Sequence, residues 1–274
     1  MTVHLFTPSA PPASAQASAF LRLRQICLVA TELDPVVEDL CAVFGVEVCH
    51  RDPEVGQFGL HNALMPFGQQ FIEVVAPTRP DTAAGRYLDR RGGDGGYMVI
   101  LDTDALPRWR THVAAIGVRV AAPLALGEYE GMQLHPRDTG GALLELNTTL
   151  GGAALDGPYW PAGPHWQQHV RAQRVSGIAG AVLQSAEPQA LARRWSQILQ
   201  RPLAQDHLAQ DHLALDNATL RFVQEGDGRG EGLAALLLHT RDAAAIESAA
   251  RARGLPCREG QVTVGGVQFH LQAA

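Results

Sequence analysis

Two glutamates of this 274-residue sequence lie in strand-like runs that are otherwise apolar, and their carboxylates could take part in chemistry. Glu145 lies between two leucines in LHPRDTGGALLELN (134–147), and Glu73 lies in QFIEVVAP (70–77). A carboxylate is costly to bury without a partner, so a metal ion, a hydrogen-bonding ligand or a proton must compensate it. The alternative interpretation is that a strand edge lets Glu145 reach water.

Two neighbouring glutamates can transfer a proton, because the charge of one keeps the other protonated. Tyr97 could donate to an enolate-like oxygen beside them. His61, in GLHNALM (59–65), could act as a base or replace a missing metal ligand, or it could simply face the helix layer or solvent. These residues favour a lyase or isomerase that moves a proton next to a carbonyl.

The elements that must position these residues follow one plan four times: a strand, a helix, then short antiparallel strands. A unit of that size cannot bury both of its faces alone, so we expect the units to pair. Helices are expected at 34–45, 105–117, 187–200 and 243–254. Strands are expected at 21–30, 58–68, 70–77, 96–104, 175–185, 213–224, 232–242 and 263–272, and a hairpin at 134–147.

The composition along the chain predicts four regions. Residues 1–19 are rich in Ala, Ser and Pro, typical of a flexible leader. A first domain (20–150) precedes a linker (151–174) dense in Gly, Pro and aromatic residues, and a second domain (175–274) follows. We expect Tyr159, Trp160 and Trp166 of the linker to form a plug packed between the two halves.

The fourfold repeat, together with HPRDTGGALLEL and FIEVVAP, resembles the vicinal oxygen chelate superfamily. That superfamily includes glyoxalase I, methylmalonyl-CoA epimerase, bleomycin-resistance proteins and extradiol ring-cleaving dioxygenases. The stretch from FGLHNALM to GGYMVI looks like an uncharacterised glyoxalase-like subgroup. The resemblance implies an α+β fold in which four βαβββ units form two glyoxalase-like domains with cupped mixed sheets.

The resemblance also implies a site. In that superfamily four strand residues, typically His or Gln, Glu, His and Glu, hold a divalent metal in the cup. The matching positions here are Gln25, Glu73, Tyr97 or Met98, and Glu145; the first two are 48 residues apart, as are Tyr97 and Glu145. Gln25, Glu73 and Glu145 are an incomplete metal set without imidazole, which suits Mg²⁺ or Mn²⁺ better than zinc, nickel or iron. A metal-dependent ring-cleaving dioxygenase is therefore the less favoured alternative.

Four residues are candidates for binding a ligand. Gln25 and Met98 would line the cup, and His135 would lie at its mouth. Arg86 could attract an anionic substrate, or it could belong to a solvated helix face. In the second domain the matching positions carry small residues and His270, so we expect a degenerate copy kept for packing and for closing the cup.

The composition limits the kinds of partner that the protein could bind. Hydrophobic residues make up 46% and charged residues 18% of the chain, and the net charge of −6 argues against wrapping nucleic acid. No apolar run is long enough to span a membrane, and the four cysteines form no CxxC pair. We expect a cytoplasmic protein with a small-molecule ligand, either a monomer with paired halves or a homodimer. The alternative function is a non-catalytic, sequestering protein of the bleomycin-resistance type.

Overall fold

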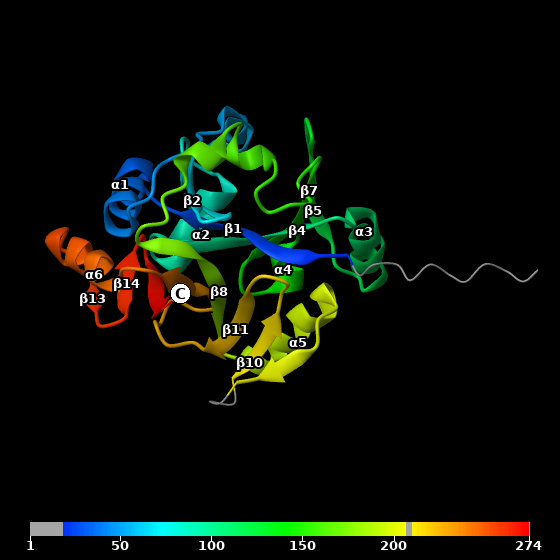
Figure 1. The fold of residues 1–274 in the computed structure, drawn as a ribbon. Coiled ribbons are helices and arrows are strands. Elements are labelled where there is room, and N and C mark those ends of the chain that lie inside the picture. The colour runs from blue at the N-terminus through cyan, green and yellow to red at the C-terminus, as the bar shows by residue number, and fades with distance from the viewer. Residues whose placement is uncertain (1–18, 207–209, 274) are drawn as a thin grey trace, which may run out of the picture.

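The computed structural model describes residues 19–206 and 210–273, so nearly all of the predicted leader (1–19) lies outside the described residues. These residues form two curved mixed sheets, one above the other in Figure 1, and each sheet carries helices. The predicted α+β fold with two cupped domains is confirmed.

The first sheet is built around two antiparallel strands, β1 (Leu21–Val29) and β4 (Gly95–Thr103). Each is joined on its other side to the last strand of its own unit, in parallel, and the described sheet runs in the order β2-β3-β1-β4-β7-β6-β5. The remaining strands are β2 (Leu60–Phe67), β3 (Gln70–Pro77), β5 (Val120–Leu126), β6 (Tyr129–Leu134) and β7 (Leu143–Thr149). In the first unit a single bridge between His50 and Leu64 stands where another strand would pair.

The second sheet repeats this plan. Strands β8 (Val175–Ser185) and β12 (Gly232–Thr240) pair antiparallel at its centre, and the described order is β13-β14-β15-β12-β8-β11-β10-β9. Its other strands are β9 (Leu203–Gln205), β10 (Asp211–Ala214), β11 (Thr219–Gln224), β13 (Cys257–Arg258), β14 (Gln261–Val264) and β15 (Val267–Ala273). The two domains therefore have the same arrangement of strands around their central pairs.

One hydrophobic core joins the helix-bearing faces of both sheets, with helices α1 (Leu33–Phe44), α3 (Leu106–Ala115), α5 (Pro188–Leu199) and α6 (Ala243–Ala252). In α1 the buried residues recur every three or four positions, which gives a single apolar face, and the helix ends at Gly45 in a left-handed conformation (φ 67°). The opposite, cupped faces lie outside this core. No helix in the described ranges is long and apolar enough to cross a membrane.

The predicted hairpin at 134–147 is confirmed in the antiparallel pairing of β6 with β7, but its tight turn is wrong, because a short helix, α4 (Pro136–Thr139), connects the two strands. Proline is well suited to the first turn of a helix, and the His135 side chain caps it by accepting a hydrogen bond from the Arg137 amide at 3.2 Å. Several elements were not assigned from the sequence: the helix α2 (Ala83–Arg91), the strands β5, β9 and β13 with most of β6, and the 3₁₀ turns η1 (Pro53–Phe58), η2 (Trp160–Ala162) and η3 (Trp166–His169).

Side-chain amides join the two domains through backbone groups. Buried Gln70 donates to the carbonyl of Ile178 and accepts from its amide, both at 2.8 Å. Asn217 makes the same pair of bonds with the backbone of Leu23, at 2.8 and 3.0 Å. The domains therefore have one fixed arrangement, defined by hydrogen bonds as well as by the shared core.

We predict that Gln70→Ala lowers the free energy of unfolding by about 2–4 kcal/mol, because it leaves a buried N–H and a buried C=O of Ile178 unpaired. Urea denaturation followed by circular dichroism measures this. The neighbouring exposed residue gives the matched control, Gln69→Ala, which should change stability by less than about 0.5 kcal/mol. Equal losses in the two variants would contradict the role given to Gln70.

Candidate functional site

The first cup gathers three of the predicted residues on its floor. Gln25 and Cys27 lie on β1, and β3 brings Glu73 beside Cys27 in the register. On the other half of the sheet, β7 brings Glu145 beside Ile100 of β4. Gln25, Glu73 and Glu145 are only 3%, 8% and 3% exposed, so the carboxyls face the interior rather than water.

Glu73 is held by neutral groups. Its Oε2 accepts a hydrogen bond from Gln25 Nε2 at 2.8 Å, and its Oε1 accepts one from Asn62 Nδ2 at 2.7 Å. The thiol of Cys27, on the cup floor, also hydrogen-bonds to it. No cation supplies this carboxyl with a hydrogen bond in the described part of the chain.

Glu145 has a similar environment on the other side of the cup. It accepts a hydrogen bond from the Tyr129 hydroxyl, and its Oε2 accepts one from Gln133 Nε2 at 3.0 Å. Asn147 Nδ2 is a longer donor at 3.4 Å. Here, too, every donor that the described residues provide is uncharged.

Burial raises the pKa of both carboxyls above the ordinary range of glutamate. The amide and hydroxyl donors act in the opposite direction, because they stabilise the ionised forms. The negative charge of Glu145 raises the pKa of Glu73 further, which shows that the two groups interact. The cup therefore holds a coupled pair of desolvated carboxyls, suited to holding and moving a proton.

The linker covers this cup. Tyr159 is 2% exposed, and its hydroxyl donates to Gln25 Oε1 at 2.9 Å. Its ring stacks on Phe71 with centroids 5.0 Å apart, and Trp166 meets Phe71 edge-on at the same separation. The plug is not where it was predicted: Tyr159 and Trp166 pack over the first cup rather than between the two halves, and Trp160 is 39% exposed.

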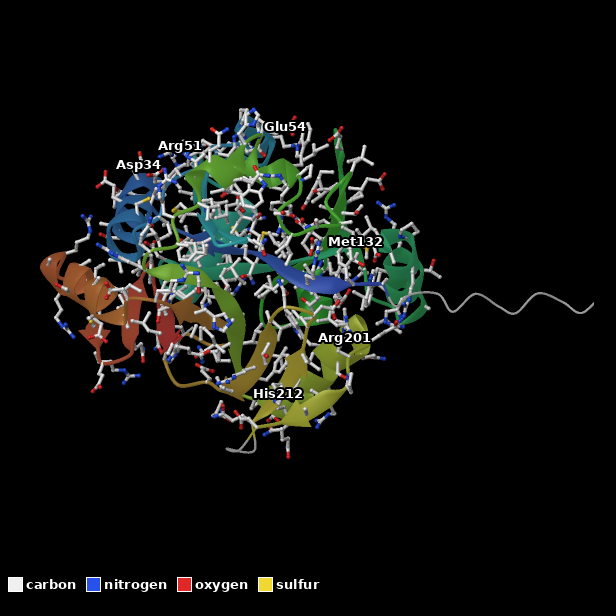
Figure 2. The ribbon with its side chains drawn as sticks, viewed as in Figure 1. Asp34, Arg51, Glu54, Met132, Arg201 and His212 are labelled. Atoms are coloured by element: carbon white, nitrogen blue, oxygen red, sulfur yellow. The ribbon has the colours of Figure 1, made fainter. Side chains whose placement is uncertain are left out.

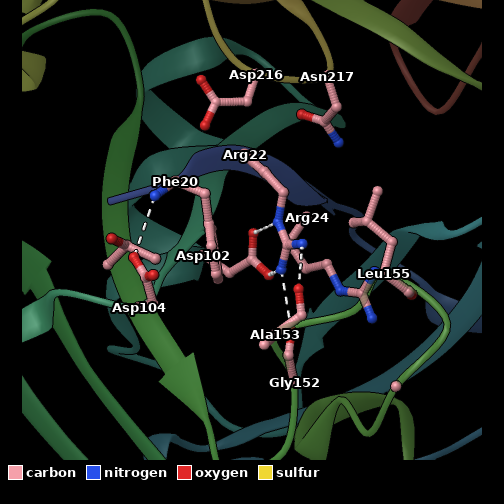
Figure 3. A network of polar contacts seen from close by, with 12 residues as sticks. Phe20, Arg22, Arg24, Asp102, Asp104, Gly152, Ala153, Leu155, Asp216 and Asn217 are labelled. Carbon is pink, nitrogen blue, oxygen red and sulfur yellow. Dashed lines mark hydrogen bonds and ion pairs between the residues drawn. The ribbon is translucent and has the colours of Figure 1, made fainter. Parts of the chain in front are cut away.

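Two buried arginines of β1 hold the linker in place (Figure 3). Arg22 forms a bidentate ion pair with Asp102 and donates to the carbonyls of Gly152 and Ala153 at 3.1 and 2.8 Å. Arg24 donates to the carbonyl of Leu155 at 2.7 Å. The first residues of the linker are therefore fixed to the strand that carries Gln25.

Arg24 also contacts the aromatic residues of the cover. Its guanidinium lies over the rings of Phe71, Tyr159 and Trp166, 4.9–5.6 Å from their centroids. Its Nε and Nη2 have no hydrogen-bond partner within the described residues. The ring faces compensate this buried cation in part, and the arrangement keeps Tyr159 over the cup.

A groove of about 670 Å³ lies outside the cover and shares Tyr159 and Trp166 with it. Its rim carries the acidic residues Asp52, Glu54 and Glu128. Figure 2 shows Glu54 at the outer edge of the molecule, on the same side as the ion pair between Asp34 and Arg51. Tyr159 therefore contacts both this groove and Gln25, whose amide holds Glu73.

The remaining predicted residues lie in different places. Met98 is buried in the cup, and Tyr97 packs edge-on against Tyr87 of α2 with centroids 5.0 Å apart. His61 is exposed on β2, His135 caps α4, and Arg86 is exposed on α2, where it donates to the Asp81 carbonyl at 2.7 Å. The structure therefore does not bring His61, His135 or Arg86 to the carboxyl pair.

Sequence reasoning missed four groups of the site: Asn62, Tyr129, Gln133 and Tyr159. Asn62 and Gln133 each stand in a largely apolar strand, the same signal that singled out the glutamates, and Gln133 pairs with Glu145 in the register. Tyr129 gives no such signal. Tyr159 was noticed, but no periodicity indicates where a loop residue will pack.

The donor set does not fit a divalent metal in this arrangement. In both carboxyls each oxygen accepts an N–H or O–H bond, and the Gln25 amide nitrogen, which cannot ligate, faces Glu73. Within residues 19–206 and 210–273, no cluster of three His, Cys, Asp or Glu side chains has metal-binding geometry. The Mg²⁺ or Mn²⁺ site stays a prediction, and no chemical step is derived through it.

Paired βαβββ units, cupped sheets and a polar site on the central strands define a glyoxalase-like fold. The model of the glyoxalase-like domain family matches residues 26–199, more than half of the chain. The protein belongs to this family and, with it, to the vicinal oxygen chelate superfamily.

Solved structures of the same kind are similar to it. A hypothetical protein from Staphylococcus aureus has 11% identity and a TM-score of 0.67, over 93% of this chain and 100% of that one. The Streptomyces coelicolor methylmalonyl-CoA epimerase (27% identity, TM-score 0.43) matches over 48% of this chain and 98% of its own. The Mycobacterium tuberculosis methylmalonyl-CoA epimerase (22%, TM-score 0.44) matches over 50% and 93%. No curated protein sequence matches the chain.

We predict a specific pH dependence of stability. Because folding raises the pKa of Glu73 and Glu145, both groups add stability that is fully present below the unfolded pKa of about 4.3. This stability is lost as the pH rises through the folded-state pKa. Glu73→Gln and Glu145→Gln should each reduce this loss, by up to about 1.4 kcal/mol per pH unit.

Denaturation midpoints measured between pH 4 and pH 8 test this, with Glu38→Gln on the exposed face of α1 as the control. The control should follow the parent protein throughout. A parallel pH profile in all four proteins would show that the carboxyls do not titrate with raised pKa values.

The cover over the first cup leads to a second prediction, which is tested by the labelling rate of Cys27. This cysteine is fully buried on the cup floor. Tyr159→Ala should accelerate labelling of Cys27 by methyl methanethiosulfonate at least about tenfold, because local opening no longer has to displace the phenol. Peptide mass mapping measures labelling at each cysteine. Labelling of Cys41, in α1, should be unchanged, as should that of Cys27 in Trp160→Ala; an unchanged rate in Tyr159→Ala would disprove the cover.

Proposed function

We propose that this protein binds a small, uncharged carbonyl compound in the first cup and moves a proton at the carbon next to the carbonyl. The observation that carries the proposal is the pair of desolvated carboxyls, Glu73 and Glu145, held only by neutral donors. A structural role alone would be served better by apolar residues of similar size.

The two carboxyls can divide the proton transfer between them, because like charges in one cup favour a state in which only one of them is ionised. The ionised carboxyl takes the proton from carbon as the base, and the protonated one gives its proton to the carbonyl oxygen as the enol forms. Reversal of both transfers, with the proton returned to a different carbon or face, completes an isomerisation.

The surroundings favour an uncharged substrate. The cup floor is apolar apart from the polar network, with Cys27, Met98 and Ile100 among its buried residues. The rim of the outer groove is acidic, and the cup itself holds negative charge, so an anion would be repelled at both stages. Entry requires the Tyr159 hydroxyl to leave Gln25, and a substrate oxygen or hydroxyl can take over that hydrogen bond.

A second candidate function is ligand binding without turnover. The observation that favours it is the closed cover itself, since Tyr159 and Trp166 are both 2% exposed. A site that opens seldom can still hold a ligand tightly, but it turns over slowly.

The test is proton exchange at carbon. We expect the intact protein to catalyse uptake of solvent deuterium by dihydroxyacetone or cyclohexanone, followed by proton NMR. Glu73→Gln and Glu145→Gln should each lower the rate at least about 100-fold, whereas Glu38→Gln should leave it unchanged. Binding of these ketones by calorimetry without exchange would favour the non-catalytic alternative, and equal rates in all variants would place the chemistry elsewhere.

A further inference from the structure

The second cup repeats the backbone positions of the first. Across the parallel strands β1 and β3, Cys27 pairs with Glu73; across β8 and β11, Val182 pairs with Arg221. The central antiparallel pairs agree, since Cys27 faces Met98 and Val182 faces Ala235. Arg221 therefore occupies the place in the second domain that Glu73 occupies in the first.

The other carboxyl has a counterpart as well. Ile100 of β4 pairs with Glu145, and Leu237 of β12 pairs with His270. The two domains thus place acids in one cup and basic residues at the matching positions of the other. Gln25 is matched by Gly180, which leaves no side chain there.

The second cup is open. A hollow of about 390 Å³ lies over β11, β8, β12 and β15, within the size range of small-molecule sites. Its floor is apolar, formed by Val182, Val223, Ala235 and Leu237. The apolar body of a ligand in it would contact this floor, and a polar group of the ligand would contact Arg221 of β11 and His270 of β15, which pair in the register with floor residues.

The charged groups around the hollow favour an anion. The Arg221 side chain lines it and has no hydrogen-bond or ion-pair partner among the residues that the structure describes. His270 lines it too, and its pKa is lowered by burial and by the positive charges of Arg258 and Arg221. The wall therefore presents an unpaired guanidinium, and an imidazole whose lowered pKa favours the neutral form, which can still donate a hydrogen bond.

Among the described residues, the one acid that lines the hollow already has partners. Asp227 accepts hydrogen bonds from the Gln184 side chain and from the Arg229 amide at 2.9 Å, and it lies 3.9 Å from Arg91 in an ion pair. It makes no ion pair with Arg221. The guanidinium and the imidazole remain as free donors on the wall of the hollow.

We propose that the second cup is a separate binding site for a small organic carboxylate, whose carboxylate pairs with Arg221 and His270 while its apolar body covers Val182, Ala235 and Leu237. The proposal does not depend on the function proposed for the first cup. It gives the second domain a ligand of its own, of opposite charge preference, in addition to the packing role expected from the sequence.

Calorimetry on the intact protein with benzoate, benzamide and inorganic phosphate tests this. Benzoate should bind at least about tenfold more tightly than benzamide, its uncharged isostere, and more tightly than phosphate, which lacks an apolar body. Arg221→Gln should weaken benzoate at least about tenfold without affecting benzamide. Arg193→Gln, an exposed arginine of α5, is the matched control and should bind benzoate like the parent.

NMR tests where benzoate binds. Benzoate should shift the imidazole signal of His270, which is assigned by its loss in His270→Gln. Equal affinity for benzoate and benzamide, unchanged benzoate binding in Arg221→Gln, or a His270 signal that does not respond would each overturn the proposal. Phosphate binding as tight as that of benzoate would do so too, because the apolar floor would then contribute nothing.

Discussion

Desolvation of two carboxyls without a cation is the constraint on which the first domain depends. A buried carboxylate with no partner would cost several kcal/mol, and an arginine beside it would fix it in the ionised form. The sequence instead surrounds Glu73 and Glu145 with amides, hydroxyls and a thiol. These groups stabilise the carboxylates only partly, so the pKa values of both carboxyls stay raised.

The cover depends on the same network. Tyr159 hydrogen-bonds to Gln25, one of the two amides that hold Glu73, and Arg24 packs on the ring of Tyr159 from the strand that carries Gln25. Opening the cup therefore removes a hydrogen bond from the site and exposes a guanidinium that the rings had covered. A ligand that replaces the phenol restores part of this loss, so binding and opening are coupled through two residues.

The sequence predicts more of the sheet than of its surroundings. The resemblance to the superfamily pointed to Gln25, Glu73 and Glu145, and all three lie buried in the first cup. Asn62 and Gln133 reach the carboxyls from neighbouring strands. Predicting these contacts requires the register between the strands, which the sequence of one strand does not contain. The helix α4 and the position of Tyr159 depend on a proline start and on packing over a distant strand, and neither leaves a periodic signal.

The two cups show how side-chain chemistry decides whether a hollow can close. A carboxyl can become neutral by binding a proton at an accessible pH, so Glu73 and Glu145 can be sealed under Tyr159. A guanidinium stays charged in any folded protein, and burying it requires a counter-charge or several acceptors. Arg24 is buried under ring faces and two backbone carbonyls, at 2.5 and 2.7 Å; Arg221 has no such neighbours in the described residues and lies in an open hollow. With the same backbone register, the acidic cup can therefore close over itself, whereas the basic cup must stay open to water or to an anion.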